Sequence, residues 1–295
     1  MAMSVQYNDR LVWPGGKKKA FTLSYDDGIT QDGRLIELFD RYKVKGTFNL
    51  NPGLFGKTGT VAAGKKEAAH DKFGKDEIKR IYAGHEAAGH GNVHCCMAGM
   101  DAARCVEEIA ASRKGLEEIY HRPVTGFAYA FGAYDETVLK TLAACGISYA
   151  RTIESTKRFD IPEDFLKWHP TCHHGDPDLE ALADEFLSDA VYFNMKTAAK
   201  LFYVWGHSYE FDQDENWDVM ERFLAKIAGH ADVWYATNGE ICAYVKAFEQ
   251  LIYTVDGTCI YNPTAVTLYV GGIFGGDYVE VKPGETAAAV PAVEM

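Results

Sequence analysis

Two hydrophobic periods alternate along most of the chain. Short runs rich in apolar and β-branched residues, typical of buried strands, are each followed by a longer segment whose apolar positions recur every three or four residues, as in an amphipathic helix. The predicted strands lie at residues 20–24, 46–50, 88–91, 124–129, 147–150, 201–205 and 233–235. The predicted helices lie at residues 32–42, 75–87, 100–120, 136–145, 181–200, 216–228 and 240–251. About seven strand–helix units in succession favour an α/β fold of the barrel type.

The pattern changes near residue 256. Short strands separated by turns that contain Gly and Pro are predicted at residues 258–261, 266–270 and 278–281. The last residues are rich in alanine and are expected to fray. We therefore expect three parts, which are a barrel at residues 1–255, a small β appendage at 256–286 and a flexible tail at 287–295.

Charge and composition narrow the choice of partners. The 295 residues include 30 Lys and Arg against 42 Asp and Glu, a formal net charge of −12, whereas nucleic-acid-binding proteins usually carry a basic excess. No apolar run approaches the roughly 18 residues of a membrane span. Neither nucleic acid nor a membrane is therefore an expected partner. Seven cysteines without a CxxC pair, and N-terminal residues without the apolar core of a secretion signal, predict a cytoplasmic protein with reduced thiols.

Residues able to bind a metal ion follow the predicted strands. Asp26 and Asp27 end the first strand, His90 ends a later one, and His94 comes four residues after it. Barrel enzymes build their sites at the carboxyl ends of strands, and two imidazoles with one carboxylate can hold a divalent ion. A polar turn that caps a helix would explain the two aspartates alone. Together with the two histidines, a metal site becomes the stronger interpretation.

Another histidine, His207, follows the apolar strand at 201–205. A polar ring at such a strand end is a candidate general acid or base, and Glu210, three residues further on, could orient it. A half-buried structural histidine is the alternative.

The segment at 152–180 is irregular and rich in Pro and His. Its His173 and His174, with Cys172 and Asp176, could imitate a metal cluster, although we favour a solvated or groove-lining loop. Aromatic residues near the strand ends could stack on sugar rings, with Phe48 and Trp205 expected in the core instead. These aromatic residues are Tyr25, Phe48, Tyr129, Phe131, Trp168, Trp205 and Tyr209.

Three short motifs together resemble those of the polysaccharide deacetylases, which are carbohydrate esterase family 4 with the NodB-homology domain. Residues 24–28 (SYDDG) look like the first family motif, T-F-D-D-G, and residues 90–94 (HGNVH) look like the second, H-[ST]-x-x-H. Residues 204–207 (VWGH) resemble the last motif, a strand that ends in L-x-H. The resemblance covers about residues 15–250, and its first two motifs are the more specific.

This resemblance implies a distorted (β/α)7-type barrel and a metal-dependent hydrolase that removes acetyl groups from N- or O-acetylated carbohydrate. One divalent ion, Zn²⁺ first and Co²⁺, Ni²⁺ or Fe²⁺ as alternatives, would be held by Asp27, His90 and His94. A water on that ion would attack the acetyl carbonyl. Asp26 would be the catalytic base and His207 the catalytic acid.

The third and fourth family motifs match less well. The third usually reads R-P-P-[YF]-G, whereas residues 128–132 read AYAFG and lack the arginine that steadies the base. Arg151, at the end of the next strand, is a candidate substitute. Phe131 stands where the family has an aromatic residue whose backbone N–H binds the oxyanion. Contacts with the oxyanion or the substrate are expected from four residues, Phe131, Tyr25, Tyr129 and Trp168. The fourth motif, an Asp-Trp pair, has no clear counterpart.

Other functions remain open at this stage. The missing motif arginine would allow a carbohydrate-binding protein that kept the fold without catalysis. The same fold could also hydrolyse a small non-sugar amide. A non-haem iron oxygenase uses the same two-histidine, one-carboxylate ligand set, but the strand–helix alternation opposes it. The preferred partner is an acetylated carbohydrate, oligomeric or polymeric.

Overall fold

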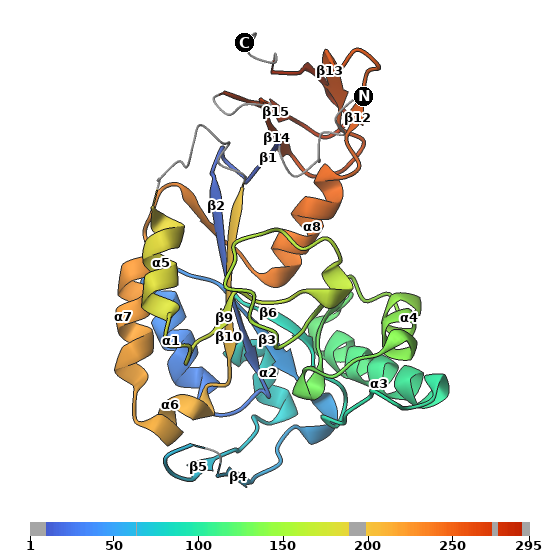
Figure 1. Cartoon of the computed structure of the whole chain (residues 1–295). Coiled ribbons are helices and arrows are strands. Elements are labelled where there is room, and N and C mark those ends of the chain that lie inside the picture. Colours follow the sequence, from blue (N-terminus) through green and yellow to red (C-terminus); the bar gives the residue numbers. More distant parts are fainter. Residues whose placement is uncertain (1–9, 63, 189–198, 273–276, 291–295) are drawn as a thin grey trace.

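A curled parallel sheet forms the centre of the computed structural model, which describes residues 10–62, 64–188, 199–272 and 277–290. Its strands follow the order β8-β7-β6-β3-β2-β10-β9, and β11 pairs with the start of β2 (Figure 1). The strands are β2 (Lys19–Asp26), β3 (Gly46–Leu50), β6 (Glu86–Gly89), β7 (Gly126–Ala128), β8 (Tyr149–Arg151), β9 (Cys172–His173), β10 (Lys200–Gly206) and β11 (Val233–Tyr235). The predicted α/β fold with a distorted (β/α)7-type barrel is confirmed.

A short irregular connection joins the two edges of this sheet. Trp168 forms a parallel bridge with Arg151 of β8, and a few residues later β9 pairs with β10. Main-chain pairing thus passes from β8 to β10 through residues 168–173. The barrel is distorted because this part of the ring has only the two residues of β9 as regular strand.

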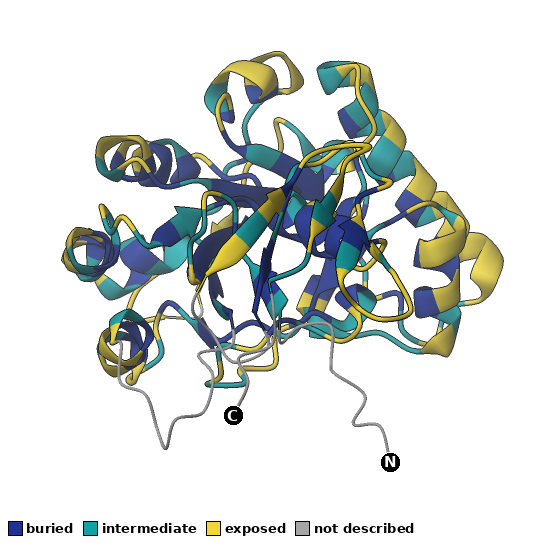
Figure 2. Ribbon diagram, turned by 90° about the horizontal axis from the view of Figure 1, so that it is seen from above, coloured by how far each residue is buried: buried dark blue, intermediate teal, exposed yellow. Residues whose placement is uncertain are grey.

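Helices surround the sheet, and Figure 2 shows buried strands at the centre with helices exposed on their outer faces. The helices are α1 (Asp32–Tyr42), α2 (Lys75–Ile81), α3 (Ala102–Tyr120), α4 (Glu136–Ala144), α5 (Leu179–Leu187), α6 (Tyr209–Asp214), α7 (Trp217–Ile227) and α8 (Asn238–Phe248). None of the helices in the described residues is long and apolar enough to span a bilayer.

Alternation along β2 separates an apolar outer face from a polar inner one. Phe21, Leu23 and Tyr25 belong to the core under the surrounding helices. Between them, Thr22 donates a hydrogen bond of 2.8 Å to Asn238, and Ser24 accepts one of 2.8 Å from Asn49. The inner face therefore carries hydrogen-bonded polar groups up to its last residue, Asp26, and a site can form inside the carboxyl end of the barrel.

The C-terminal strands and the N-terminal β1 form two small antiparallel sheets, β1-β14-β15 and β12-β13-β16. They comprise β1 (Leu11–Val12), β12 (Ile252–Tyr253), β13 (Cys259–Tyr261), β14 (Leu268–Gly271), β15 (Tyr278–Val281) and β16 (Thr286–Ala288). Figure 1 places them near the start of β2, at the end of the barrel opposite its carboxyl edge. The appendage therefore does not cover the strand ends where the predicted site lies.

Several predicted elements end elsewhere than expected. The helix predicted at 75–87 stops at Ile81, because Gly84 takes a left-handed turn (φ 87°), and residues 86–87 belong to β6. The helix predicted at 181–200 stops at Leu187, Lys200 begins β10, and residues 189–198 lie outside the described part.

Several short elements, α6 among them, were missed, and the predicted tail begins later than expected. The irregular segment at 152–180 contains β9. Residues 54–73, between the predicted strand at 46–50 and the predicted helix at 75–87, contain a hairpin of β4 (Thr60–Val61) and β5 (Ala68–Ala69). Residues 287 and 288, expected in the flexible tail, pair with β13 as part of β16. Elements of two or three residues carry too few side chains for a detectable hydrophobic period.

Candidate active site

The predicted ligands converge at the carboxyl edge of the sheet. Asp27 follows β2 directly, and His90 follows β6. His94 belongs to the turn after β6, where its backbone is left-handed (φ 56°). One possible ligand atom from each of the three lies within 4.8 Å of the others. The structure therefore brings together the three residues expected to hold the ion.

Asp27 is held in an unusual backbone conformation with φ at 83°, which is strained for a residue with a side chain. Its carboxylate Oδ2 lies 3.1 Å from His70 Nε2, and Lys72 Nζ donates to its main-chain oxygen at 2.6 Å. Burial would raise the pKa of Asp27, but the hydrogen bond from His70 and the charge of Lys72 hold it well below its usual range. The side chain is therefore an anionic ligand at neutral pH.

The two histidines are prepared as neutral ligands. His90 Nδ1 donates 2.9 Å to the main-chain oxygen of Ala128, which fixes the ring and leaves Nε2 as the free nitrogen. Burial lowers the pKa of His90, and burial with the neighbouring imidazole lowers that of His94 to about 4. A carboxylate and two neutral imidazoles within this distance fit a divalent ion such as Zn²⁺.

Asp26 lies beside this ligand set and is almost completely buried. Arg151 donates a charged hydrogen bond to its Oδ2, and Asn49 donates to its Oδ1 at 2.8 Å. In the register of β7 and β8, Arg151 stands opposite Ala128, the position at which the expected motif arginine is missing. Burial would raise the pKa of Asp26, but Arg151 and, to a lesser degree, His90 lower it below its ordinary value.

His207 and Asp26 form a pair of facing titratable groups. Its Nε2 lies 3.9 Å from Asp26 Oδ2, and its Nδ1 lies 3.2 Å from Glu210 Oε1, the orienting contact that their spacing suggested. Burial would lower the pKa of His207, but the hydrogen bond to Glu210 and the charge of Asp26 raise it above its ordinary value. The site therefore favours an ionised aspartate facing a protonated imidazole.

Phe131 lies at the mouth of the site and is 64% exposed. Its ring packs edge-on against His94, with 4.7 Å between centroids, and its backbone is left-handed (φ 59°). Within the described part of the chain, the Phe131 N–H donates no main-chain hydrogen bond.

The other three expected substrate contacts are wrong, because their side chains are buried. Tyr25 points outward from β2 into the core and stacks on His174. Tyr129 donates its hydroxyl to Leu166 at 2.7 Å, and Trp168 is only 1% exposed. None of the three rings is exposed beside the ligand set.

Most residues of this site lie in a segment that matches a known protein family. Residues 14–150 match the family model described as polysaccharide deacetylase. These residues belong to the polysaccharide deacetylase family. The matched deacetylase segment contains Asp26, Asp27, His90, His94 and Phe131, so it supplies most of the site.

One solved structure shares the fold of this chain, and two others are similar to it. A candidate polysaccharide deacetylase from Mycobacterium smegmatis is 18% identical, with a TM-score of 0.58 over 81% of this chain and 94% of that one. A family 4 acetyl xylan esterase from Clostridium thermocellum is 14% identical, with a TM-score of 0.48 over 76% and 90%. A family 4 carbohydrate esterase from Streptomyces lividans is 13% identical, with a TM-score of 0.48 over 75% and 93%. No curated protein matches the chain.

Three side chains of the site were not expected from the sequence. His70 and Lys72 reach Asp27 from the end of the β4–β5 hairpin, a region in which the sequence pattern predicts neither a strand nor a helix. Their period-two spacing, with both side chains turned to one side, was the only available signal. Asn49, the last but one residue of β3, was also missed.

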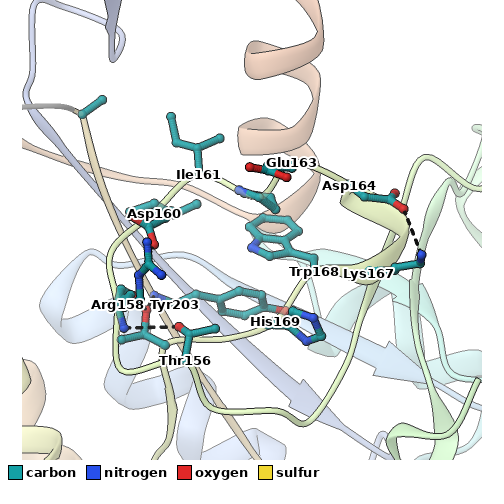
Figure 3. Close-up of a pocket in the computed structure, with 14 residues that line it drawn as sticks. Thr156, Arg158, Asp160, Ile161, Glu163, Asp164, Lys167, Trp168, His169 and Tyr203 are labelled. Atoms are coloured by element: carbon teal, nitrogen blue, oxygen red, sulfur yellow. Dashed lines mark hydrogen bonds and ion pairs between the residues drawn. The ribbon is translucent and has the colours of Figure 1, made fainter. Parts of the chain in front are cut away.

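One cavity among the described residues lies apart from this site. It measures about 540 Å³ and is lined mainly by the segment from Thr156 to Thr171 (Figure 3). Of the predicted site residues, only Trp168 borders it. This cavity therefore does not include the ligand set Asp27, His90 and His94.

Proposed function

We propose that the protein is a metal-dependent hydrolase that removes acetyl groups from N- or O-acetylated carbohydrate. One observation carries the proposal, namely that a buried, ionised Asp26 lies between the ligand set Asp27, His90 and His94 and the imidazole of His207. Such a pair of titratable groups beside a metal site suits acyl hydrolysis. Membership of residues 14–150 in the polysaccharide deacetylase family supports the same reaction.

Asp27, His90 and His94 would hold the ion, for which Zn²⁺ is the first choice and Co²⁺, Ni²⁺ or Fe²⁺ are alternatives. When bound, the ion supplies a Lewis acid that polarises the acetyl carbonyl and makes water a better nucleophile. The carboxylate of Asp27 and the neutral imidazoles need no proton loss before they bind it.

Asp26 is the proposed base. Asn49 donates to its Oδ1, and its Oδ2, which also accepts from Arg151, faces both His90 Nε2 at 3.7 Å and His207 Nε2 at 3.9 Å. A proton from the attacking water would therefore be accepted at Oδ2. Arg151 keeps this carboxylate ionised and prevents it from turning away.

His207 is the proposed acid. Its imidazolium would donate a proton from Nε2 to the departing amine or alkoxide, while Glu210 stabilises the positive ring at Nδ1. An amine leaves poorly unless it is protonated, so amide cleavage depends on this step most. The Phe131 N–H would donate to the oxyanion of the tetrahedral intermediate.

The chemistry of the molecule also suggests where and on what it acts. A net charge of −12 disfavours anionic polymers and suits a neutral acetylated sugar. All seven cysteines are free thiols, which supports a reducing compartment such as the cytoplasm.

We also propose that the barrel at residues 1–255 is the catalytic domain, with the appendage at 256–286 remote from the site.

Acetate release tests this function directly. Purified protein is expected to release acetate from acetylated chitooligosaccharides or acetylxylan, to lose that activity with a chelator, and to regain it with Zn²⁺. Sugar binding without acetate release would instead support the non-catalytic alternative. Oxygen consumption by the iron-loaded protein would support the oxygenase. Release from small non-sugar amides alone would exclude the carbohydrate substrate.

The pH dependence of Glu210→Gln tests the acid. His207 acts in its protonated form, so activity falls as pH rises through its pKa, which Glu210 helps to raise above the ordinary 6.5. Without that carboxylate the pKa falls, and the basic limb of kcat/KM should move to lower pH. Glu249→Gln, an exposed glutamate at the end of α8, is the control and should leave the profile unchanged. A basic limb that does not move in Glu210→Gln would contradict the role of His207.

A further inference from the structure

A second group of possible metal ligands lies next to the first. It consists of His173, His207 and Glu210, whose ligand atoms lie within 4.8 Å of one another. His173 Nε2 is 3.0 Å from Glu210 Oε2, and His207 Nδ1 is 3.2 Å from Glu210 Oε1. Two imidazoles and a carboxylate are again the donor set that Zn²⁺ prefers.

The three side chains stand on ordered elements. His173 ends β9 and lies opposite Trp205 in the register with β10, and its ring packs edge-on against that indole at 4.8 Å. Glu210 lies in the first turn of α6, and its N–H donates to the main-chain oxygen of His207 at 3.2 Å. The ligand positions are therefore fixed by a strand pair and a helix start rather than by a free loop.

Access and charge also fit a cation. The side chains of His173, His207 and Glu210 are 28%, 19% and 24% exposed, so solvent can reach the cluster. Among the described residues, Glu210 forms ion pairs only with histidines, namely these two and the buried His174 at 3.2 Å. No lysine or arginine in the described ranges neutralises the carboxylate.

We propose that His173, His207 and Glu210 bind a second divalent transition-metal ion, and that this ion inhibits the enzyme. An ion bound to Nδ1 of His207 uses the lone pair of that nitrogen and lies where Nδ1 now contacts Glu210. The ring can then no longer take up a second proton and become an imidazolium. The remaining Nε2–H of a neutral imidazole is a much weaker acid and does not protonate the leaving group. The inhibition rests on the proposed deacetylase function, whereas binding of the ion does not.

Counting ions separates the two sites. After equilibrium dialysis against Zn²⁺ alone, elemental analysis should find two ions per wild-type chain, one in Asp27→Ala and one in His173→Gln. His169→Gln is the matched control, because this histidine lies on the same segment, is 32% exposed and contacts Thr152 rather than Glu210, and it should keep two. Circular dichroism checks that each variant is folded.

Inhibition is measured on the same proteins. Acetate release by the wild type should peak near one equivalent of Zn²⁺ and fall with more, whereas His173→Gln should need at least about tenfold more Zn²⁺ for the same loss. One ion in the wild type, or two in folded His173→Gln, would overturn the second site. Two ions without inhibition would overturn the inhibitory role. Two ions with no acetate release at any Zn²⁺ level would refute the deacetylase function and the inhibition, while the second site stands.

Discussion

Replacing Asp26 with asparagine is expected to lower acetate release by about 10²–10⁴-fold, the usual contribution of a general base. Asparagine keeps the size of the side chain and an oxygen for Asn49, but it cannot accept the proton at the position of Oδ2. The ligands Asp27, His90 and His94 are untouched, so the ion at the first site should remain. The measurement is kcat together with the zinc content of the dialysed protein.

Asp27→Ala is the matched variant at the neighbouring position. It removes a ligand rather than the base, so the protein should lose the ion of the first site and all metal-dependent turnover. The two variants would then differ in what they lose. Asp26→Asn would keep the ion of the first site and lose turnover, whereas Asp27→Ala would lose the ion itself. Turnover that survives in Asp26→Asn would contradict the base assignment, and an unchanged zinc content in Asp27→Ala would contradict the ligand set.

The contacts within this site were predictable to different degrees. Asp26, Asp27, His90, His94 and His207 could be grouped from the sequence because each ends or follows a strand. In a parallel sheet the carboxyl ends of the strands meet at one edge. The structure brings them together there. Their distances, and the left-handed backbone at Asp27 and His94, depend on the whole barrel and could not be read from local patterns.

Burial of the aromatic residues could have been predicted better. Tyr25 precedes Asp26 on β2, and neighbouring residues of a strand point to opposite faces. If Asp26 faces the barrel interior, Tyr25 must face the helices, where the structure places it. Proximity to a motif in sequence was therefore a poor guide to contact with substrate, whereas the period of the strand would have excluded this tyrosine.

The groups that tune the aspartates come from distant segments, and sequence alone did not locate them firmly. His70 and Lys72 depend on how the β4–β5 hairpin folds over Asp27. Arg151 was one candidate among the charged residues for the missing motif arginine. Its position became definite only when the register placed it opposite Ala128, so that the neighbouring strand supplies the guanidinium at the same level of the barrel.

Replacing Arg151 with methionine is accordingly expected to destabilise the protein by about 3–5 kcal/mol, the usual cost of leaving one partner of a buried ion pair alone. Methionine can retain apolar contact with Trp205, on whose ring the guanidinium now lies at 4.3 Å. The carboxylate of Asp26 would remain buried without its main countercharge. Urea unfolding at pH 7 measures the loss. Arg222→Met, which breaks an exposed pair with Asp218 on α7, should change stability little.

The pH dependence of that loss distinguishes a charge effect from a packing defect. In the wild type the pKa of Asp26 lies below its ordinary value, so the pair stabilises the fold above that value and the contribution is lost as pH falls. Without Arg151, burial raises the pKa, so the stability of Arg151→Met should instead fall as pH rises. Adding Asp26→Asn removes the unpaired charge, and the double variant should recover stability at pH 7 and lose this pH dependence. A double variant no more stable than Arg151→Met would mean that the arginine acts through packing alone.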